Sequence, residues 1–167
     1  MASASILHVG NDVCQRIPVL TRAGFAVRRS EDSIQAICAA LTGEDPFSAI
    51  LFHCDMAPPA ETTVHEARSL SDAPLVLFQN PTVLCNDRDF DLVVPVLIPP
   101  GIWLKKLKEL IEESHRLCEQ AHRLHKDCDS VRSQSRSLRA SAARNRKVSI
   151  DPNAPWQGKS GPPREPK

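Results

Sequence analysis

Several residue types and patterns are scarce in this chain of 167 residues. It has no tyrosine, two tryptophans and six glycines. No run of about 18 uninterrupted apolar residues is present, and the N-terminus lacks the charged and apolar regions of a secretory signal. We therefore expect a cytoplasmic protein that does not contact a membrane.

Motifs that carry chemistry are also missing. There is no glycine-rich phosphate loop, no nucleophile elbow, and no Cys/His pair with a supporting acid at a strand end. The six cysteines show no CxxC spacing, so we expect reduced thiols and no structural zinc. The sequence predicts a non-enzymatic protein that needs no cofactor.

Charge divides the chain into two parts. Residues 1–115 hold 9 Lys and Arg against 15 Asp and Glu, whereas residues 116–167 hold 12 against 5, which gives net charges of −6 and +7. Such asymmetry is typical of an acidic folded domain with a basic extension. We predict a folded domain at residues 1–113, a long helix at 102–147, and a disordered, basic, proline-rich tail at 148–167.

Five apolar segments predict buried strands, at residues 6–9, 25–29, 48–54, 74–78 and 92–98. Helical segments alternate with them, although the one before the last strand is short and either helical or irregular, so the pattern predicts five βα repeats with right-handed crossovers. The expected fold class is α/β, a doubly wound five-stranded parallel sheet. Ligands bind at the carboxyl ends of such strands, which points to Gly10–Asp12, His53–Asp55, Gln79 and Ile98.

Four segments at these strand ends carry a family resemblance: ILHVGND, FSAILFHCDMAPP, APLVLFQN and DLVVPVLIPP. Over roughly residues 4–115 the sequence resembles the receiver domains of bacterial response regulators, which have the CheY-like fold. The resemblance implies a role in signal transduction, in a phosphorelay with an upstream histidine kinase.

The residues of this sequence match the phosphorylation site of that family poorly. The family uses an acidic pair after the first strand to hold Mg²⁺, because a hard cation prefers carboxylate oxygens. Here Gly10 and Asn11 occupy the pair, and Asp12 follows one position later. Gln79 stands where the family has a hydroxyl residue, and Ile98 where it has a lysine.

The phosphoacceptor position depends on the alignment chosen. Aligning the strand core AILF places His53 there, whereas aligning Pro59 places Asp55 there. The strand core is the tighter constraint, which favours His53. We therefore predict a degenerate pseudo-receiver that acts as a protein-interaction module. The alternative is a phosphorylatable receiver with Asp55 as phosphoacceptor and Asp12 as a Mg²⁺ ligand.

The predicted long helix has a seven-residue repeat. No Gly or Pro interrupts residues 102–147, so the helix can run about 65 Å at about 1.5 Å per residue. Large apolar residues occupy the d positions of this repeat, namely Leu110, Leu117, Leu124, Val131 and Leu138. The a positions lie three residues earlier and are small after the first heptad: Leu107, Ser114, Ala121, Cys128 and Ser135.

This repeat predicts a coiled coil from about residue 107. A second copy of the chain is the favoured partner, which gives a homodimer, and a helix of another protein is the alternative. A third interpretation is a helix that folds back on its own domain. Charge favours a parallel pair, in which Asp127 faces the partner's Arg132.

Two further features of this helix are interpreted as solvent-exposed. His115, Cys118, His122 and His125 share one helical face and have the spacing of metal ligands, but a lone helix supplies no supporting shell. The basic run near residues 136–147 has no helix-turn-helix pattern or interleaved aromatic residues, so nucleic acid is not an expected partner.

Overall fold

The structure, a computed structural model, describes residues 4–43, 45–54 and 57–149, with side chains as far as Arg144. By their contacts these residues fall into two units, one ending at Glu119 and the next beginning at Gln120. None of the helices in these ranges has the length and apolar character needed to cross a membrane. The elements in chain order are β1 Ser5–Val9, α1 Arg16–Arg22, β2 Ala26–Ser30, α2 Ile34–Leu41, β3 Ala49–Cys54, α3 Glu61–Leu70, β4 Leu75–Gln79, β5 Leu92–Pro95 and α4 Pro100–Ser149.

The five strands form one parallel sheet in the order β2-β1-β3-β4-β5. The predicted α/β doubly wound sheet is therefore confirmed. The central strands carry uninterrupted apolar runs because both faces of a parallel sheet are covered. Cys54 at the end of β3 pairs with Gln79 at the end of β4, so the carboxyl ends of these strands share one edge.

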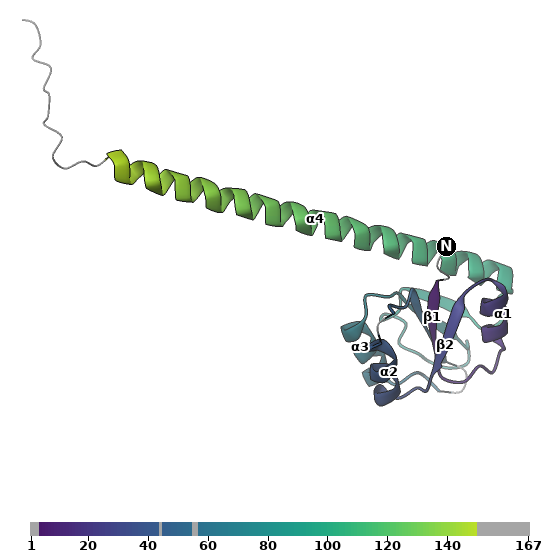
Figure 1. Ribbon diagram of the computed structural model, residues 1–167. Helices are drawn as coiled ribbons and strands as arrows, with labels where there is room; N and C mark the ends of the chain where they lie inside the picture. Colours follow the sequence, from purple (N-terminus) through teal and green to yellow (C-terminus); the bar gives the residue numbers. More distant parts are fainter. Residues whose placement is uncertain (1–3, 44, 55–56, 150–167) are drawn as a thin grey trace, which may run out of the picture. The chain divides into compact units, whose positions relative to one another are not determined.

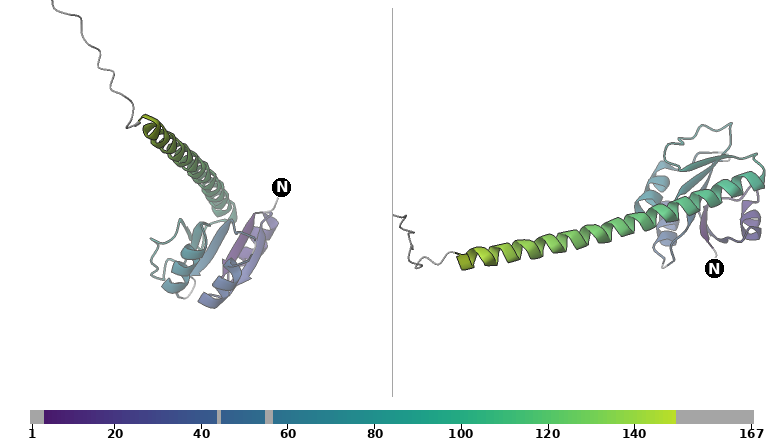
Figure 2. Two further views of the ribbon diagram at one scale, coloured as in Figure 1. Left: turned by 60° about the vertical axis from the view of Figure 1, so that its left-hand side comes forward. Right: turned by 90° about the horizontal axis from the view of Figure 1, so that it is seen from above.

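Helices cover both faces of the sheet (Figure 1). The side chains of each strand alternate between these two faces. On one face, α2 and α3 pack over a core that includes Leu7, Ile50 and Phe52. On the other face, α1 and the first turns of α4 pack over Ile6 and Leu51. The two views of Figure 2 show the same three layers.

One of the five predicted βα repeats lacks its helix, because the short segment before the last strand is irregular. Residues 80–91, between β4 and β5, contain no helix. Asn80 instead organises a turn, since its side-chain oxygen accepts hydrogen bonds from the backbone N–H and the hydroxyl of Thr82. Val83, Cys85 and Phe90 of this loop pack against the core on the α2–α3 face, where a helix would otherwise supply apolar contacts.

A disulfide joins Cys54 and Cys85, which corrects the expectation that all six thiols are reduced. The sequence did not predict the pair because it depends on the β4–β5 loop folding over the end of β3. Cys14, Cys38, Cys118 and Cys128 are not part of a disulfide.

The last helix, α4, begins at Pro100 and continues to Ser149 without a break (Figure 2). Proline suits the first helical position, because the N–H that it lacks would have no partner there. The predicted long helix is thus present over residues 102–147. The predicted tail lies outside the described residues from residue 150 onward.

Candidate functional site at the carboxyl edge of the sheet

The turn after β1 brings no carboxylate to the first two predicted pocket positions. Gly10 has φ +90°, a backbone conformation that favours glycine, and its N–H donates to the carbonyl of Ser30 at 2.9 Å. Asn11 is exposed. This turn therefore links the ends of β1 and β2 and offers no acidic ligand of its own.

Asp12, the candidate Mg²⁺ ligand, caps the start of α1. One carboxylate oxygen accepts the backbone N–H of Arg16 at 2.6 Å, and the other accepts that of Ile17 at 3.0 Å. These N–H groups belong to the first turn of a helix, where backbone donors have no partner within the helix. Both oxygens of Asp12 are thus engaged in holding α1 in place.

Arg16 extends from α1 to the end of β3 and is buried, with 4% of its surface exposed. Its Nη1 donates to Nδ1 of His53 at 2.7 Å. Its guanidinium carbon lies 4.0 Å from the centre of the Phe78 ring, within the range of a cation–π contact. A positive charge of the chain itself therefore lies beside His53, the favoured acceptor position.

His8 completes this cluster from β1 and is fully buried. Its ring lies 4.2 Å from that of His53, which in turn stacks on Phe78 at 5.3 Å. The Nε2 atom of His8 is 3.7 Å from the Asp12 carboxylate. Among the described residues, neither ring nitrogen of His8 has a hydrogen-bond partner, nor has Nε2 of His53.

Both histidines are held in the neutral form. Burial, the neighbouring His8 and the Arg16 charge together lower the pKa of His53 to about 2. Burial also lowers the pKa of His8, assisted by Arg29 and Arg16 and opposed by Asp12. Since Arg16 can only donate hydrogen bonds, the Nδ1 of His53 must accept, and the His53 proton resides on Nε2.

The other predicted pocket positions that the structure describes belong to the sheet and the core. Gln79 is half-buried and pairs with Cys54 and Pro95 in the sheet. Ile98 packs against the core on the α1–α4 face. Asp55, the candidate phosphoacceptor, lies outside the described residues. No grouping of three or more His, Cys, Asp or Glu side chains suited to a metal ion occurs in the described part of the chain.

Sequence reasoning missed Arg16, which contributes the only charge buried in this cluster that the structure describes. The available signal was its spacing: Arg16 precedes the buried Leu20 by four residues, so both lie on the face of α1 that meets the sheet. An arginine on a core-facing position requires buried partners, and His53 and Phe78 are such partners.

The apolar stripe of α4 begins later than predicted. Leu107 is only 1% exposed and Leu110 packs against the domain, so the first heptad belongs to the domain core. From Leu117 onward the d positions are largely exposed: Leu117 50%, Leu124 58%, Val131 60% and Leu138 72%. We call these four residues the α4 stripe.

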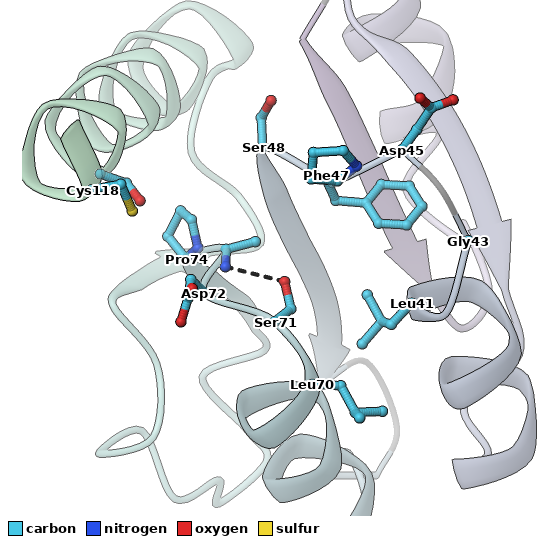
Figure 3. A pocket seen from close by; sticks show the side chains of 13 residues that line it. Leu41, Gly43, Asp45, Phe47, Ser48, Leu70, Ser71, Asp72, Pro74 and Cys118 are labelled. Atoms are coloured by element: carbon cyan, nitrogen blue, oxygen red, sulfur yellow. Dashed lines mark hydrogen bonds between the residues drawn. The ribbon is translucent and has the colours of Figure 1, made fainter. Parts of the chain in front are cut away.

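A groove of about 510 Å³ lies at the opposite, amino-terminal edge of the sheet (Figure 3). It is lined by the end of α2, the loop into β3, the loop between α3 and β4, and Ser114 and Cys118 of α4. Two exposed carboxylates, Asp45 and Asp72, lie on its wall.

No protein-family model matches the sequence, and a search of curated proteins gives no significant match. Solved structures do match. An adenylate cyclase from Rhodopirellula baltica has a TM-score of 0.61 at 15% identity, over 75% of this chain and 99% of that chain. A CheY-like response regulator receiver domain protein from Methanospirillum hungatei has a TM-score of 0.55 at 18% identity, over 69% and 98%.

A third match is the receiver domain of a sensor histidine kinase from Pseudomonas aeruginosa, solved with a magnesium ion in its active-site cleft. Its TM-score is 0.53 at 22% identity, over 66% of this chain and 99% of that chain. A structure containing the trimeric coiled coil of yeast Spc42 matches at a TM-score of 0.52 and 16% identity, over 89% and 98%. At these identities the likeness concerns the fold: the chain has the CheY-like receiver fold, as its sequence predicts, followed by a long helix.

Proposed function

We propose that this chain is a non-catalytic signalling module, a pseudo-receiver that works without phosphorylation and associates through α4. The observation that supports this proposal most strongly is the position of Arg16. Its guanidinium is buried between His53 and Phe78, at the edge where receiver domains carry out their chemistry.

A cation in the pocket would meet unfavourable conditions. Mg²⁺ prefers hard oxygen ligands and would be repelled by the guanidinium of Arg16. The nearby ring nitrogens are poor ligands for Mg²⁺, and both oxygens of Asp12 already accept hydrogen bonds from α1. In this proposal Arg16 supplies a permanent positive charge in place of an exchangeable metal ion.

The α4 stripe supports the association part of the proposal. Four large apolar side chains lie exposed at seven-residue intervals on one helix. Burying each of them against a partner helix gains about 1.5 to 3 kcal/mol when burial is complete. A helix of this length with an exposed apolar seam is stabilised by pairing, and a second copy of the chain offers an identical seam.

The first experiment tests independence from phosphorylation. Beryllofluoride with Mg²⁺ mimics the phosphoryl group of an aspartyl phosphate. We expect it to change neither the solution mass nor the fluorescence of Trp103, which packs edge-on against Phe78. Asp55→Asn should behave like the unmodified chain, as should the control Asp87→Asn in the exposed β4–β5 loop.

A response to beryllofluoride that Asp55→Asn abolishes and Asp87→Asn retains would contradict the proposal. It would support the alternative, a working phospho-receiver that uses Asp55 and Asp12 with Mg²⁺ and receives its phosphoryl group from a histidine kinase.

The second experiment tests association through α4. Leu124→Asp places a charge in the stripe and should convert the associated chain to a monomer, as measured by light scattering. Ser133→Asp is the matched control, because it adds the same side chain on the opposite face of the helix and should leave the mass unchanged. Equal masses for both variants and the unmodified chain would contradict the role of the stripe.

A further inference from the structure

The small residues beside the α4 stripe carry information about how two helices can pair. At the a positions beyond the first heptad stand Ser114, Ala121, Cys128 and Ser135, each three residues before a member of the stripe. Large d positions therefore alternate with small a positions along the whole seam. The orientation of a partner helix decides which of these residues meet.

In a parallel pair, like positions meet. The layers would alternate between two large side chains and two small ones, and the small layers would leave poorly filled space. In an antiparallel pair, each a position meets a d position of the partner. Every layer would then combine one large and one small side chain, which gives nearly uniform filling.

One antiparallel register uses all eight positions. It places Ser114 against the partner's Leu138, Ala121 against the partner's Val131, Cys128 against the partner's Leu124 and Ser135 against the partner's Leu117. Shifting this register by one heptad leaves two of the eight positions of each chain, one a and one d, without a partner from this set. The seam thus specifies a single best antiparallel alignment.

Charge complementarity favours the same orientation. Residues 1–115 carry a net charge of −6, and residues 116–167 carry +7. An antiparallel pair brings the basic end of each α4, with Arg136, Arg139 and Arg144, to the acidic domain of the other copy. A parallel pair places the two acidic domains together and the two basic ends together.

The groove beside Ser114 is the place where these charges would meet. Asp45 and Asp72 lie on its wall, and Ser114 and Cys118 form its α4 side. In the register above, the partner's Leu138 lies against Ser114, so the partner's Arg139 follows at the mouth of the groove. The sheet edge and the partner helix then have opposite charge.

One contact runs against this arrangement. Asp127 would face the partner's Asp127 at the centre of the seam, whereas a parallel pair sets it against the partner's Arg132. Arg132 already has an acidic neighbour within its own helix, Asp129 at 3.8 Å. A single exposed pair at the rim contributes less than the filling of the core layers along the seam.

We propose that a second copy of this chain docks antiparallel along α4, with Ser114 opposite the partner's Leu138 and the basic end of the partner's helix at the Asp45–Asp72 groove. This inference rests on the proposed function, because it assumes association through the stripe. It replaces the parallel orientation that the Asp127–Arg132 pair alone favours.

Disulfide trapping tests the orientation in the full-length chain. Cys14, Cys38, Cys118 and Cys128 are first replaced by Ser, and light scattering compares the solution mass of this background with that of the unmodified chain, because Cys128 is itself a seam position. Ser114→Cys and Leu138→Cys are then made in separate chains of this background. In the proposed register the two 138 positions lie about 36 Å apart along the axis, whereas positions 114 and 138 of opposite chains are neighbours.

We expect a mixture of the two variants to give a cross-linked product that joins one chain of each kind, while each variant alone remains uncross-linked. Self-cross-linking of Leu138→Cys would overturn the antiparallel orientation but leave the proposed association standing. A dimer with no cross-link in any sample would overturn the register. An unmodified chain that is monomeric would instead remove the proposed function on which the inference rests.

Salt dependence gives a second readout that needs no substitution. Because the antiparallel pair joins an acidic domain to a basic helix end, added NaCl should weaken association and raise the dimer Kd several-fold. A parallel pair would respond in the opposite way, since salt screens the repulsion between like ends. A Kd that falls with added NaCl would therefore overturn the proposal.

Discussion

Acidification from pH 7 to pH 5 should destabilise the receiver-fold domain through its two buried histidines. His53 has a pKa of about 2 in the folded protein because it is buried beside His8 and the Arg16 guanidinium. In the unfolded chain a histidine has a pKa of about 6.5. Below that value the unfolded chain takes up a proton that the folded domain refuses, so the free energy of unfolding falls with pH.

The magnitude follows from this linkage. Each pH unit between the two pKa values of His53 lowers the free energy of unfolding by about 1.4 kcal/mol. From pH 7 to pH 5 the loss from His53 alone is about 2 kcal/mol, because the effect begins only near pH 6.5. His8 adds a loss of the same sign, since its pKa is also lowered by burial. Domains of this size have about 5 to 15 kcal/mol of stability, so the effect is large enough to measure.

Urea unfolding at pH 7, 6 and 5 measures the effect at constant ionic strength and protein concentration. The fluorescence of buried Trp103 reports on the domain when the other tryptophan, Trp156, is replaced by Phe. His53→Gln should reduce the pH dependence and leave the part that His8 contributes. His115→Gln, at an exposed position on α4, should retain the full dependence. A stability that is constant from pH 7 to pH 5, or a dependence that His53→Gln leaves intact, would refute the reasoning.

Three further predictions concern stability at neutral pH and are measured by the same unfolding assay. Ser33→Ala should cost about 1 kcal/mol, because its hydroxyl accepts the N–H of Ala36 and caps α2. Phe52→Ala should cost about 3 to 5 kcal/mol, since this side chain is fully buried in the α2–α3 core. Reduction of the Cys54–Cys85 disulfide, which closes a segment with a sequence separation of 31, should cost about 3 to 4 kcal/mol. A change in the free energy of unfolding near zero would contradict the helix cap, the buried core position or the stabilising effect of the disulfide, respectively.

The fold was predictable because its signals lie within single segments. The apolar runs at residues 6–9 and 48–54 are long enough to mark strands that are buried on both faces, and the observed strands β1 and β3 match them closely. The segment between β4 and β5 has no such local signal for its loop. There, alternation suggested one more repeat, but Asn80 directs the chain into a loop whose apolar residues serve the core directly.

The cluster at the carboxyl edge was predictable only in part, because its members come from different elements. Asp12 and His53 follow or end predicted strands, and the topology of a parallel sheet predicts a site at these strand ends. Arg16 is on a helix and enters the cluster through a long side chain, and no local pattern reports where such a side chain ends. Leu107 was assigned to the coiled coil but is buried in the domain. A heptad pattern does not distinguish a residue that packs on its own domain from one that packs on a partner helix.

The chemistry of the cluster constrains how a signal can act on this domain. A ligand shifts a conformational equilibrium only by the difference in its affinity for the two states. In the proposed pseudo-receiver the positive charge belongs to Arg16 and cannot leave, so neither metal binding nor phosphorylation changes the charge at the pocket. The sheet and its helices would then serve as a fixed platform, and any regulated step would involve the association of α4. Variants at Arg16 would act on the stability of the domain, whereas variants in the α4 stripe would act on assembly.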